Sequence, residues 1–230
     1  MKICYLVPFM PPDYAGGGRR AYNQVKHIAR QGHDITIVTF TNRTETNKNI
    51  RIINLSIPAY SKPNLHGQTL KKIISLPKLL WKMINILKFN KFDLIHCIVG
   101  ANSTATLIAL LASFLTKTKI TIGTTLAYED DPLTIKNSKF GKLKFALMNR
   151  ANAIICISPL IYSLAEESGL SHNLIHLIPN SVSIEKFSMC NQFDKEKLKY
   201  DLGMTSFKHI LLNIGILHPR KNTIEVIEVF

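Results

Sequence analysis

Short apolar runs rich in β-branched residues alternate along the chain with stretches whose apolar positions recur every three or four residues. Runs of the first kind are typical of strands in a parallel sheet that helices cover on both sides. They predict strands over Ile3–Val7, Ile35–Phe40, Ile50–Leu55, Leu94–Val99, Ile120–Ile122, Ala153–Ile157, Leu174–Ile178 and Ile210–Ile214. The second kind predicts helices over Arg20–Arg30, Thr104–Leu115, Phe140–Asn149, Pro159–Ser168 and Asp194–Gly203. The alternation predicts an α/β fold, a doubly wound parallel sheet with right-handed crossovers.

A domain boundary is expected near Met204. Residues 1–204 are predicted to form one domain, and residues 205–230 begin a new strand, loop and helix. A complete domain needs roughly 100 residues. We therefore expect residues 205–230 to be the start of a second domain that the sequence does not complete.

Charge is distributed unevenly along the sequence. The net charge is +14, and the segment Thr46–Phe92 holds nine basic residues and no acidic one. Within it, Leu70–Lys88 predicts an amphipathic helix or helix pair, with Pro77 at a helix start or a kink. Two interpretations stay open: a patch that binds an anionic membrane surface, or an ordinary surface helix with solvated lysines.

The remaining composition favours a cytoplasmic protein. The four cysteines form no C-x-x-C pair, and Cys4, Cys97 and Cys156 each fall in an apolar run, as small core residues do. The N-terminal apolar stretch is too short for a signal peptide, and the longest apolar run, Ala105–Leu115, is about half a bilayer span. We expect no transmembrane helix.

The segment Pro8–Arg20 carries three consecutive glycines followed by two arginines, directly before a predicted helix. Glycines let the backbone N–H groups approach an anion closely, and a helix start adds positive charge. The segment predicts an anion cradle; the alternative is a turn that merely needs glycine. A G-x-G-x-x-A dinucleotide pattern is present but comes too late after the strand, and no acidic residue ends the second strand. An NAD-dependent enzyme is discounted on these grounds.

Four stretches in order resemble the N-terminal domain of the large retaining GT-B glycosyltransferase family, often called group 1 or family four. They are the glycine-rich loop with Gly32–Thr39, the D-x-x-H strand at Phe92–His96, the segment from Ala153 to Asn180, and the loop Gly215–Asn222 that opens the donor domain. The sequence departs from the family pattern at Ile98, Ser181, Ser183 and Ile216. The paired glutamates of the family's donor domain would lie beyond Phe230.

The resemblance implies site residues. Gly17 and Gly18, with Lys221 and Arg220 of the second lobe, would bind the donor diphosphate without a metal ion or cofactor. His96, at the end of a strand, would be catalytic by positioning a hydroxyl, or would be a hydrogen-bonded core histidine. Arg19 and Arg20 near the cradle, and Glu129 and Asp130 after the fifth strand, are the candidates for acceptor binding. An acidic surface loop is the alternative for the last two.

The predicted function is transfer of a sugar from a nucleotide sugar to a saccharide or a lipid-linked saccharide, in glycan biosynthesis. By itself the 230-residue chain is expected to be inactive, with a separate chain as one possible source of the donor lobe. The alternative function is a non-catalytic basic module that binds an acidic membrane or another polyanion. The expected location is the cytoplasm, with peripheral attachment to the inner face of the membrane as an alternative. Nucleic acid is not expected as a partner, because aromatic residues are sparse in the basic segment and no recognition motif is present.

Overall fold

The computed structural model describes residues 1–10, 16–41, 49–57, 69–182, 184, 187–214 and 221–229. The chain divides into two compact units, Met1–Asn180 and Ser181–Phe230. The first unit holds every strand described below, and it carries most of the predicted site residues. Each unit is considered by itself.

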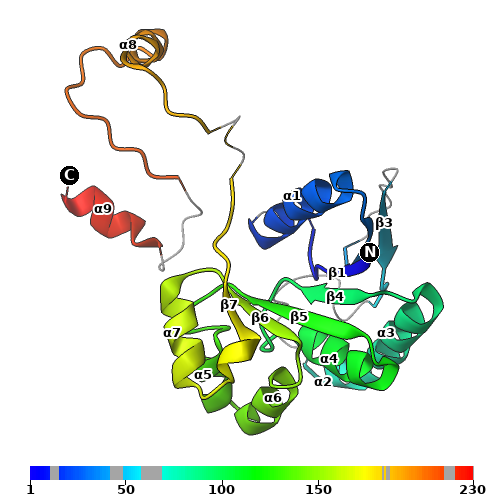
Figure 1. Cartoon of the computed structure of the whole chain (residues 1–230). Coiled ribbons are helices and arrows are strands. Elements are labelled where there is room, and N and C mark those ends of the chain that lie inside the picture. Colours follow the sequence, from blue (N-terminus) through cyan, green and yellow to red (C-terminus); the bar gives the residue numbers. More distant parts are fainter. Residues whose placement is uncertain are drawn as a thin grey trace. The chain divides into compact units, whose positions relative to one another are not determined.

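The first unit is built on a seven-stranded sheet with the order β3-β2-β1-β4-β5-β6-β7 (Figure 1). All six neighbouring pairs are parallel. The predicted doubly wound α/β fold is therefore confirmed, with seven of the eight expected strands. They are β1 (Lys2–Leu6), β2 (Asp34–Thr39), β3 (Ile50–Asn54), β4 (Leu94–Cys97), β5 (Lys119–Thr124), β6 (Ala153–Cys156) and β7 (Ile175–Leu177).

Helices cover the two faces of the sheet unequally. Among the described residues, one helix, α1 (Gly16–Arg30), lies on one face and packs Ala21, Val25 and Ala29 against the apolar side chains of β1 and β2. Figure 1 shows the remaining helices of the unit across the opposite face. They are α2 (Thr69–Ile74), α3 (Leu76–Asn90), α4 (Thr104–Thr116), α5 (Pro132–Asn137), α6 (Gly141–Met148) and α7 (Pro159–Glu167).

The amphipathic segment predicted over residues 70–88 is a helix pair. Pro77 lies in the first turn of α3, where its missing N–H costs no hydrogen bond. The side chains of Leu79, Met83 and Leu87 follow a four-residue spacing and are buried in the larger core cluster, on the face opposite α1. Burial of this stripe fixes α3 against the sheet and leaves its other side to solvent.

Helix ends are closed by local hydrogen bonds. Ser158 caps α7 by accepting from the N–H of Ile161 at 3.3 Å, and Asp131 caps α5 by accepting from the N–H of Thr134 at 2.9 Å. The residues that terminate α3 and α4, Lys91 and Lys117, have positive φ angles of 50° and 57°. Glycine is the residue that adopts this left-handed conformation at the lowest cost.

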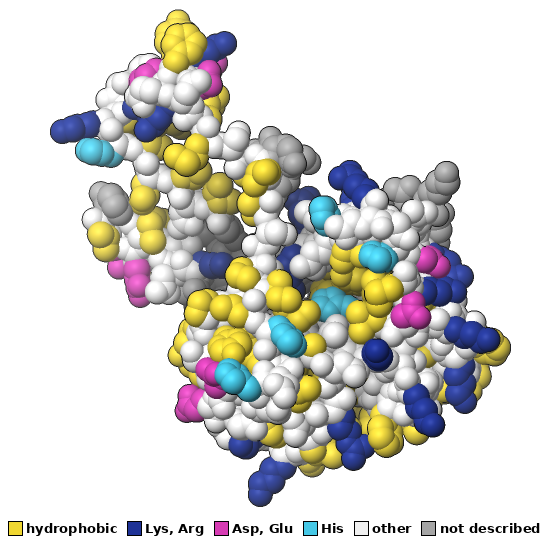
Figure 2. Space-filling view, in the orientation of Figure 1, with side chains coloured by type: hydrophobic (Ala, Val, Ile, Leu, Met, Phe, Trp, Pro, Cys, Tyr) yellow, Lys and Arg dark blue, Asp and Glu magenta, His cyan; other side chains and the backbone are white. Residues whose placement is uncertain are grey.

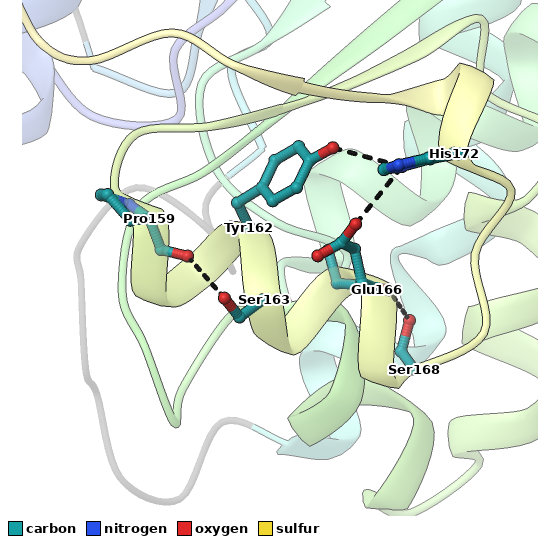
Figure 3. Close-up of polar contacts among 7 residues, drawn as sticks. Pro159, Tyr162, Ser163, Glu166, Ser168 and His172 are labelled. Atoms are coloured by element: carbon teal, nitrogen blue, oxygen red, sulfur yellow. Dashed lines mark hydrogen bonds and ion pairs between the residues drawn. The ribbon is translucent and has the colours of Figure 1, made fainter.

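A short 3-10 helix, η2 (His172–Leu174), joins α7 to β7, and side chains of α7 hold it in place (Figure 3). The Nδ1 atom of His172 lies 3.2 Å from the hydroxyl of Tyr162 and 3.4 Å from Oε1 of Glu166. The two α7 residues are one helical turn apart, so they face the same side. Their contacts position the chain where it enters the last strand.

Within its described residues, the second unit contains two helices, α8 (Gln192–Asp201) and α9 (Thr223–Val229). Both agree with the prediction. The strand predicted over Ile210–Ile214 was wrong: these residues have no regular structure and stay exposed. An isolated strand has no stability without neighbours that satisfy its backbone groups, and the described residues of this unit provide no second strand. The assignment of residues 205–230 to a separate donor lobe stays a prediction.

Replacement of Lys91 tests the left-handed helix ends. Lys91→Gly removes the clash between Cβ and the backbone, whereas Lys91→Gln keeps that clash and removes the charge alone. We expect the glycine variant to exceed the glutamine variant by about 1 kcal/mol in free energy of unfolding, measured by urea denaturation. Lys117→Gly and Lys117→Gln form a second, independent pair. Equal stability within each pair would contradict the prediction.

Candidate functional site

The carboxyl ends of the seven strands meet at one edge of the sheet, and the strand order reverses between β1 and β4. The chain leaves β1 toward one face and β4 toward the other, which opens a crevice at this point. Three segments with predicted site residues lie along this edge: the start of α1, the end of β4, and the loop after β5. The sheet topology therefore brings them together, although they are far apart in the sequence.

The three glycines belong to the helix, which corrects the prediction of a loop that ends at Arg20. Helix α1 begins at Gly16, so Gly16, Gly17 and Gly18 form its first turn. The first four N–H groups of a helix have no partner within it, and they carry the positive end of the helix dipole. Gly18 is buried, Gly17 is half-buried, and Gly16 is exposed with open space around its Cα atom. Residues 11–15 lie outside the described residues.

Arg20 bridges two loops at the carboxyl edge. Its Nη2 atom donates to the carbonyl oxygen of Ile98, just after β4, at 3.1 Å. Its Nη1 atom donates to Oδ1 of Asn180, beyond β7, at 3.3 Å. Arg20 is half-buried, whereas Arg19 is exposed. The predicted role of both arginines in acceptor binding stays a prediction, and the structure adds a bridging role for Arg20.

His96 lies on β4 on the same face as α1. Its ring packs edge-on against Tyr5 with centroids 5.0 Å apart, and its Nδ1 atom lies 2.9 Å from the Thr121 hydroxyl. That hydroxyl also lies 3.5 Å from the Ile95 carbonyl oxygen, and when it donates to this oxygen, Nδ1 carries the hydrogen and Nε2 keeps its lone pair. Burial, and secondarily the charge of Arg20, lower the pKa of His96 from 6.5 to about 4. The ring is neutral near pH 7 and can accept a hydrogen bond.

Asp130 organises the loop after β5. Its carboxylate accepts from the N–H groups of Thr125 (2.9 Å), Leu126 (2.7 Å) and Gly100 (3.2 Å), and from the Thr125 hydroxyl (3.2 Å). Burial raises the pKa of Asp130, and these hydrogen bonds oppose the rise. Its carboxylate therefore holds the loops after β4 and β5 together. The neighbouring Glu129 is exposed, and acceptor binding by either residue stays a prediction.

The two basic residues that are predicted to bind the donor phosphates belong to the second unit. Arg220 is outside the described residues, and Lys221 is an exposed residue of the second unit, just before α9. Their role stays a prediction. Within the residues that the structure describes, no three His, Cys, Asp or Glu side chains cluster in a way that could hold a metal ion.

Sequence reasoning missed three contributors to this edge: Thr121, Asn180 and Gly100. The pairing of His96 with Thr121 follows from the register of β4 and β5, which cannot be inferred from the sequence alone. Asn180 appears in the sequence only as the end of a family-like segment, and its contact with Arg20 spans 160 residues. Gly100 gave a detectable signal, since a glycine directly after a strand marks close backbone approach.

Taken together, a parallel sheet with a glycine-rich helix start at its switch point defines the Rossmann-like lobe of a GT-B fold. The sequence model of Glycosyltransferase Family 4 matches residues 14–186, about three quarters of the chain. The chain belongs to this family. The resemblance inferred from the motifs is thereby confirmed.

Solved structures with the same fold include glycosyltransferases. Alr3699/HepE of Anabaena, in complex with UDP and glucose, has a TM-score of 0.53 at 17% identity and matches 89% of this chain and 51% of its own. A glycosyltransferase from Rickettsia africae has a TM-score of 0.57 at 15% identity and matches 89% and 50%. An uncharacterized 41.2 kDa protein in the cps region of Klebsiella pneumoniae is 26% identical over 153 residues, which is 62% of this chain and 42% of that protein. The chain thus spans about half the length, or less, of the proteins it matches.

Replacement of Gly100 tests the contact between the two loops. A Cβ atom at this position would lie 2.4 Å from the backbone oxygen of Asp130, which is far inside van der Waals distance. We expect Gly100→Ala to lower the free energy of unfolding by about 1–3 kcal/mol. The matched control is Gly16→Ala, where a Cβ atom meets nothing within 4 Å. Equal stability of the two variants in urea denaturation would contradict the contact.

The protonation of His96 gives a second test. The folded pKa is about 4 against 6.5 for the free side chain. The folded state therefore resists protonation, and its stability falls as the pH drops from 6.5 toward 4. His96→Gln should remove this part of the pH dependence, and Arg20→Met should raise the pKa of His96. Both are measured by NMR titration and by urea unfolding at several pH values. An NMR midpoint near 6.5 in the unaltered protein would contradict the argument.

Proposed function

We propose that this chain is the acceptor-side lobe of an enzyme that transfers a sugar from a nucleotide sugar to a saccharide or lipid-linked saccharide acceptor, with retention of the anomeric configuration. Family membership supports the transferase class. The observation that carries the proposal is the three-glycine first turn of α1 at the β1/β4 switch point. A diphosphate fits that position because free N–H groups and the helix dipole converge there.

The donor diphosphate is the group on which charge develops when the sugar leaves. In the proposal, the N–H groups of Gly17 and Gly18 donate hydrogen bonds to the charged diphosphate from one side, and Lys221 with Arg220 does so from the second lobe. Fixed dipoles and cations stabilise a leaving diphosphate without the cost of reorganising solvent. The reaction as proposed uses no metal ion.

The acceptor is proposed to lie beside His96. Thr121 and Ile155, on the same sheet face, are only half-buried, so this part of the face is accessible within the described residues. A neutral imidazole with a free Nε2 lone pair can accept a hydrogen bond from a sugar hydroxyl and orient it. Arg19, Arg20 and Glu129 are proposed to contact the polar acceptor at the same edge, and Asp130 to act through the loop that it organises.

Donor specificity is proposed to be for a uridine nucleotide, since a structural neighbour was solved with UDP and glucose. Because the chain spans about half of that neighbour, activity is proposed for the complete protein with both lobes, whether on one chain or two. Glycan biosynthesis is the proposed setting.

The test is nucleotide-sugar binding and transfer by the complete protein. We expect UDP-glucose, or another UDP-sugar of a panel, to bind, and Gly17→Val to weaken binding by about ten- to hundredfold. Valine keeps the backbone N–H, but its side chain would obstruct the close approach of the diphosphate, and the expected loss corresponds to one charge-assisted hydrogen bond of about 1.5–3 kcal/mol. Lys221→Ala should weaken binding comparably, as measured by calorimetry.

Lys26→Ala is the control for Lys221→Ala, because it removes an exposed lysine from α1 about two turns beyond the glycines. It should leave affinity and turnover unchanged. Unaltered affinity in Gly17→Val and Lys221→Ala would remove both residues from the donor site. Failure of every nucleotide sugar in the panel to bind the unaltered protein would overturn the proposed function and favour a non-catalytic module.

A further inference from the structure

Helix α3 presents lysines and aromatic residues on the side turned away from the sheet. Lys78, Trp81 and Lys88 follow three- and seven-residue spacing, opposite the buried stripe, and Phe89 flanks them. Trp81 is 64% exposed and Phe89 is 85% exposed. A large aromatic side chain in water is common when it stands alone, but here two lie among lysines on a single helix face.

Neighbouring elements extend this surface. Ile73 and Ile74 of α2 are 56% and 76% exposed, and Phe114 and Leu115 at the end of α4 are about 60% exposed. Helix α3 packs against both α2 and α4. In Figure 2, yellow apolar side chains alternate with dark-blue lysine and arginine side chains on the side where Figure 1 places α3 and α4. We call this set the α3 face: Lys78, Trp81, Lys88, Phe89, Ile73, Ile74, Phe114 and Leu115.

A pocket of about 460 Å³ opens between the ends of α3 and α4, beside the α3 face. Four lysines line it: Lys88, Lys91, Lys117 and Lys119. Its one acidic group is Asp93, and the carboxylate of Asp93 accepts from the backbone N–H of Lys2 at 2.7 Å. The pocket is therefore strongly positive and has the size and charge to take a phosphate-bearing group.

Two of the pocket lysines occupy positions that favour glycine. Lys91 and Lys117 are the left-handed residues that end α3 and α4. A lysine there is conformationally unfavourable compared with glycine. Both helix ends carry a lysine, and the two lysines line the same pocket, although glycine would suit the left-handed backbone better. Functional groups are often retained at a cost in stability, and a shared anionic ligand accounts for both lysines.

We propose that the α3 face docks on an anionic phospholipid bilayer, with a lipid headgroup phosphate in the lysine pocket. Lysines are attracted by anionic headgroups, and Trp, Phe, Ile and Leu side chains enter the boundary between headgroups and acyl chains. Nucleic acid is the less suitable partner, because the exposed aliphatic side chains of Ile73, Ile74 and Leu115 would make no favourable contact with a hydrated phosphate backbone. Membrane contact accounts for the charges and the apolar groups together.

Docking at this place is compatible with the candidate site. The pocket lies where β4 and β5 begin, at the amino edge of the sheet, and the candidate site lies at the carboxyl edge. A bound headgroup therefore does not occupy the proposed sugar-transfer site. The proposal does not depend on the proposed donor, and its test can fail without affecting that proposal. Within the described residues, no helix is long and apolar enough to cross a membrane.

The experiment is co-sedimentation of the complete protein with vesicles of phosphatidylcholine alone and of phosphatidylcholine with phosphatidylglycerol. We expect binding to the anionic vesicles only. The pocket variant Lys88→Gln/Lys91→Gly/Lys117→Gly should lose affinity by about fivefold for each lysine removed. The apolar variant Trp81→Ser/Phe89→Ser should lose affinity at high salt as well, where screening has already weakened the lysine contribution.

Matched controls lie on α8 of the second unit. Lys195→Gln/Lys197→Gln removes exposed charge, and Phe193→Ser/Tyr200→Ser removes exposed aromatic groups, outside the α3 face. Both controls should bind vesicles like the unaltered protein. All variants should bind nucleotide sugar normally, and thermal unfolding should show the pocket variant at least as stable as the unaltered protein, which excludes misfolding.

Three outcomes would overturn the proposal. The first is equal binding to neutral and anionic vesicles, and the second is equal loss of affinity in the α8 controls. The third is binding to duplex DNA as strong as to anionic vesicles with no effect of the apolar variant, which would assign the lysines to a general polyanion site.

Discussion

The reversal of strand order between β1 and β4 is the constraint from which the candidate site follows. Right-handed crossovers send the chain to opposite faces after these two strands. Neither the connection after β1 nor the connection after β4 covers the carboxyl ends between these two strands, so a crevice stays open there. Arg20 reaches across it from α1 to the carbonyl oxygen of Ile98, and a glycine turn starts α1 beside it. Backbone topology thus supplies the position, and a few polar groups supply the chemistry.

The pattern of apolar residues predicted the sheet well because the strands are rich in β-branched residues and are apolar on both faces. Seven strands were located to within a residue or two, and the amphipathic segment around Pro77 was recognised from its period, as a helix or a helix pair. The pattern failed at Ile210–Ile214, where an equally apolar run forms no strand. An apolar run specifies a strand only when partners exist for its backbone groups. Composition cannot tell whether those partners are present.

The site was harder to predict than the fold. His96 was identified from its place at a strand end, but its neutral state depends on burial and on the charge of Arg20. Its ring is held by Thr121 and Tyr5, and these three residues come from three other elements. Glu129 and Asp130 are adjacent in sequence, and only the structure separates them. One is exposed, and the carboxylate of the other holds two loops together. Such differences arise from tertiary contacts, for which a single sequence carries no direct signal.

The two edges of the sheet differ in the kind of positive charge that each would offer to the anion proposed to bind there. At the carboxyl edge, α1 begins with three glycines that carry the positive end of the helix dipole, and burial keeps His96 neutral. The positive charge proposed for this site is therefore held in place, as fixed dipoles and as the Arg20 guanidinium, which donates hydrogen bonds to Ile98 and Asn180. At the amino edge, mobile lysine side chains line an open pocket. Fixed dipoles suit a transition state, because they need no reorganisation when charge develops. Flexible ammonium groups suit a fluid and variable partner, because they can follow its charges. The difference in rigidity, more than the sign of the charge, therefore separates a site for chemistry from a surface for attachment.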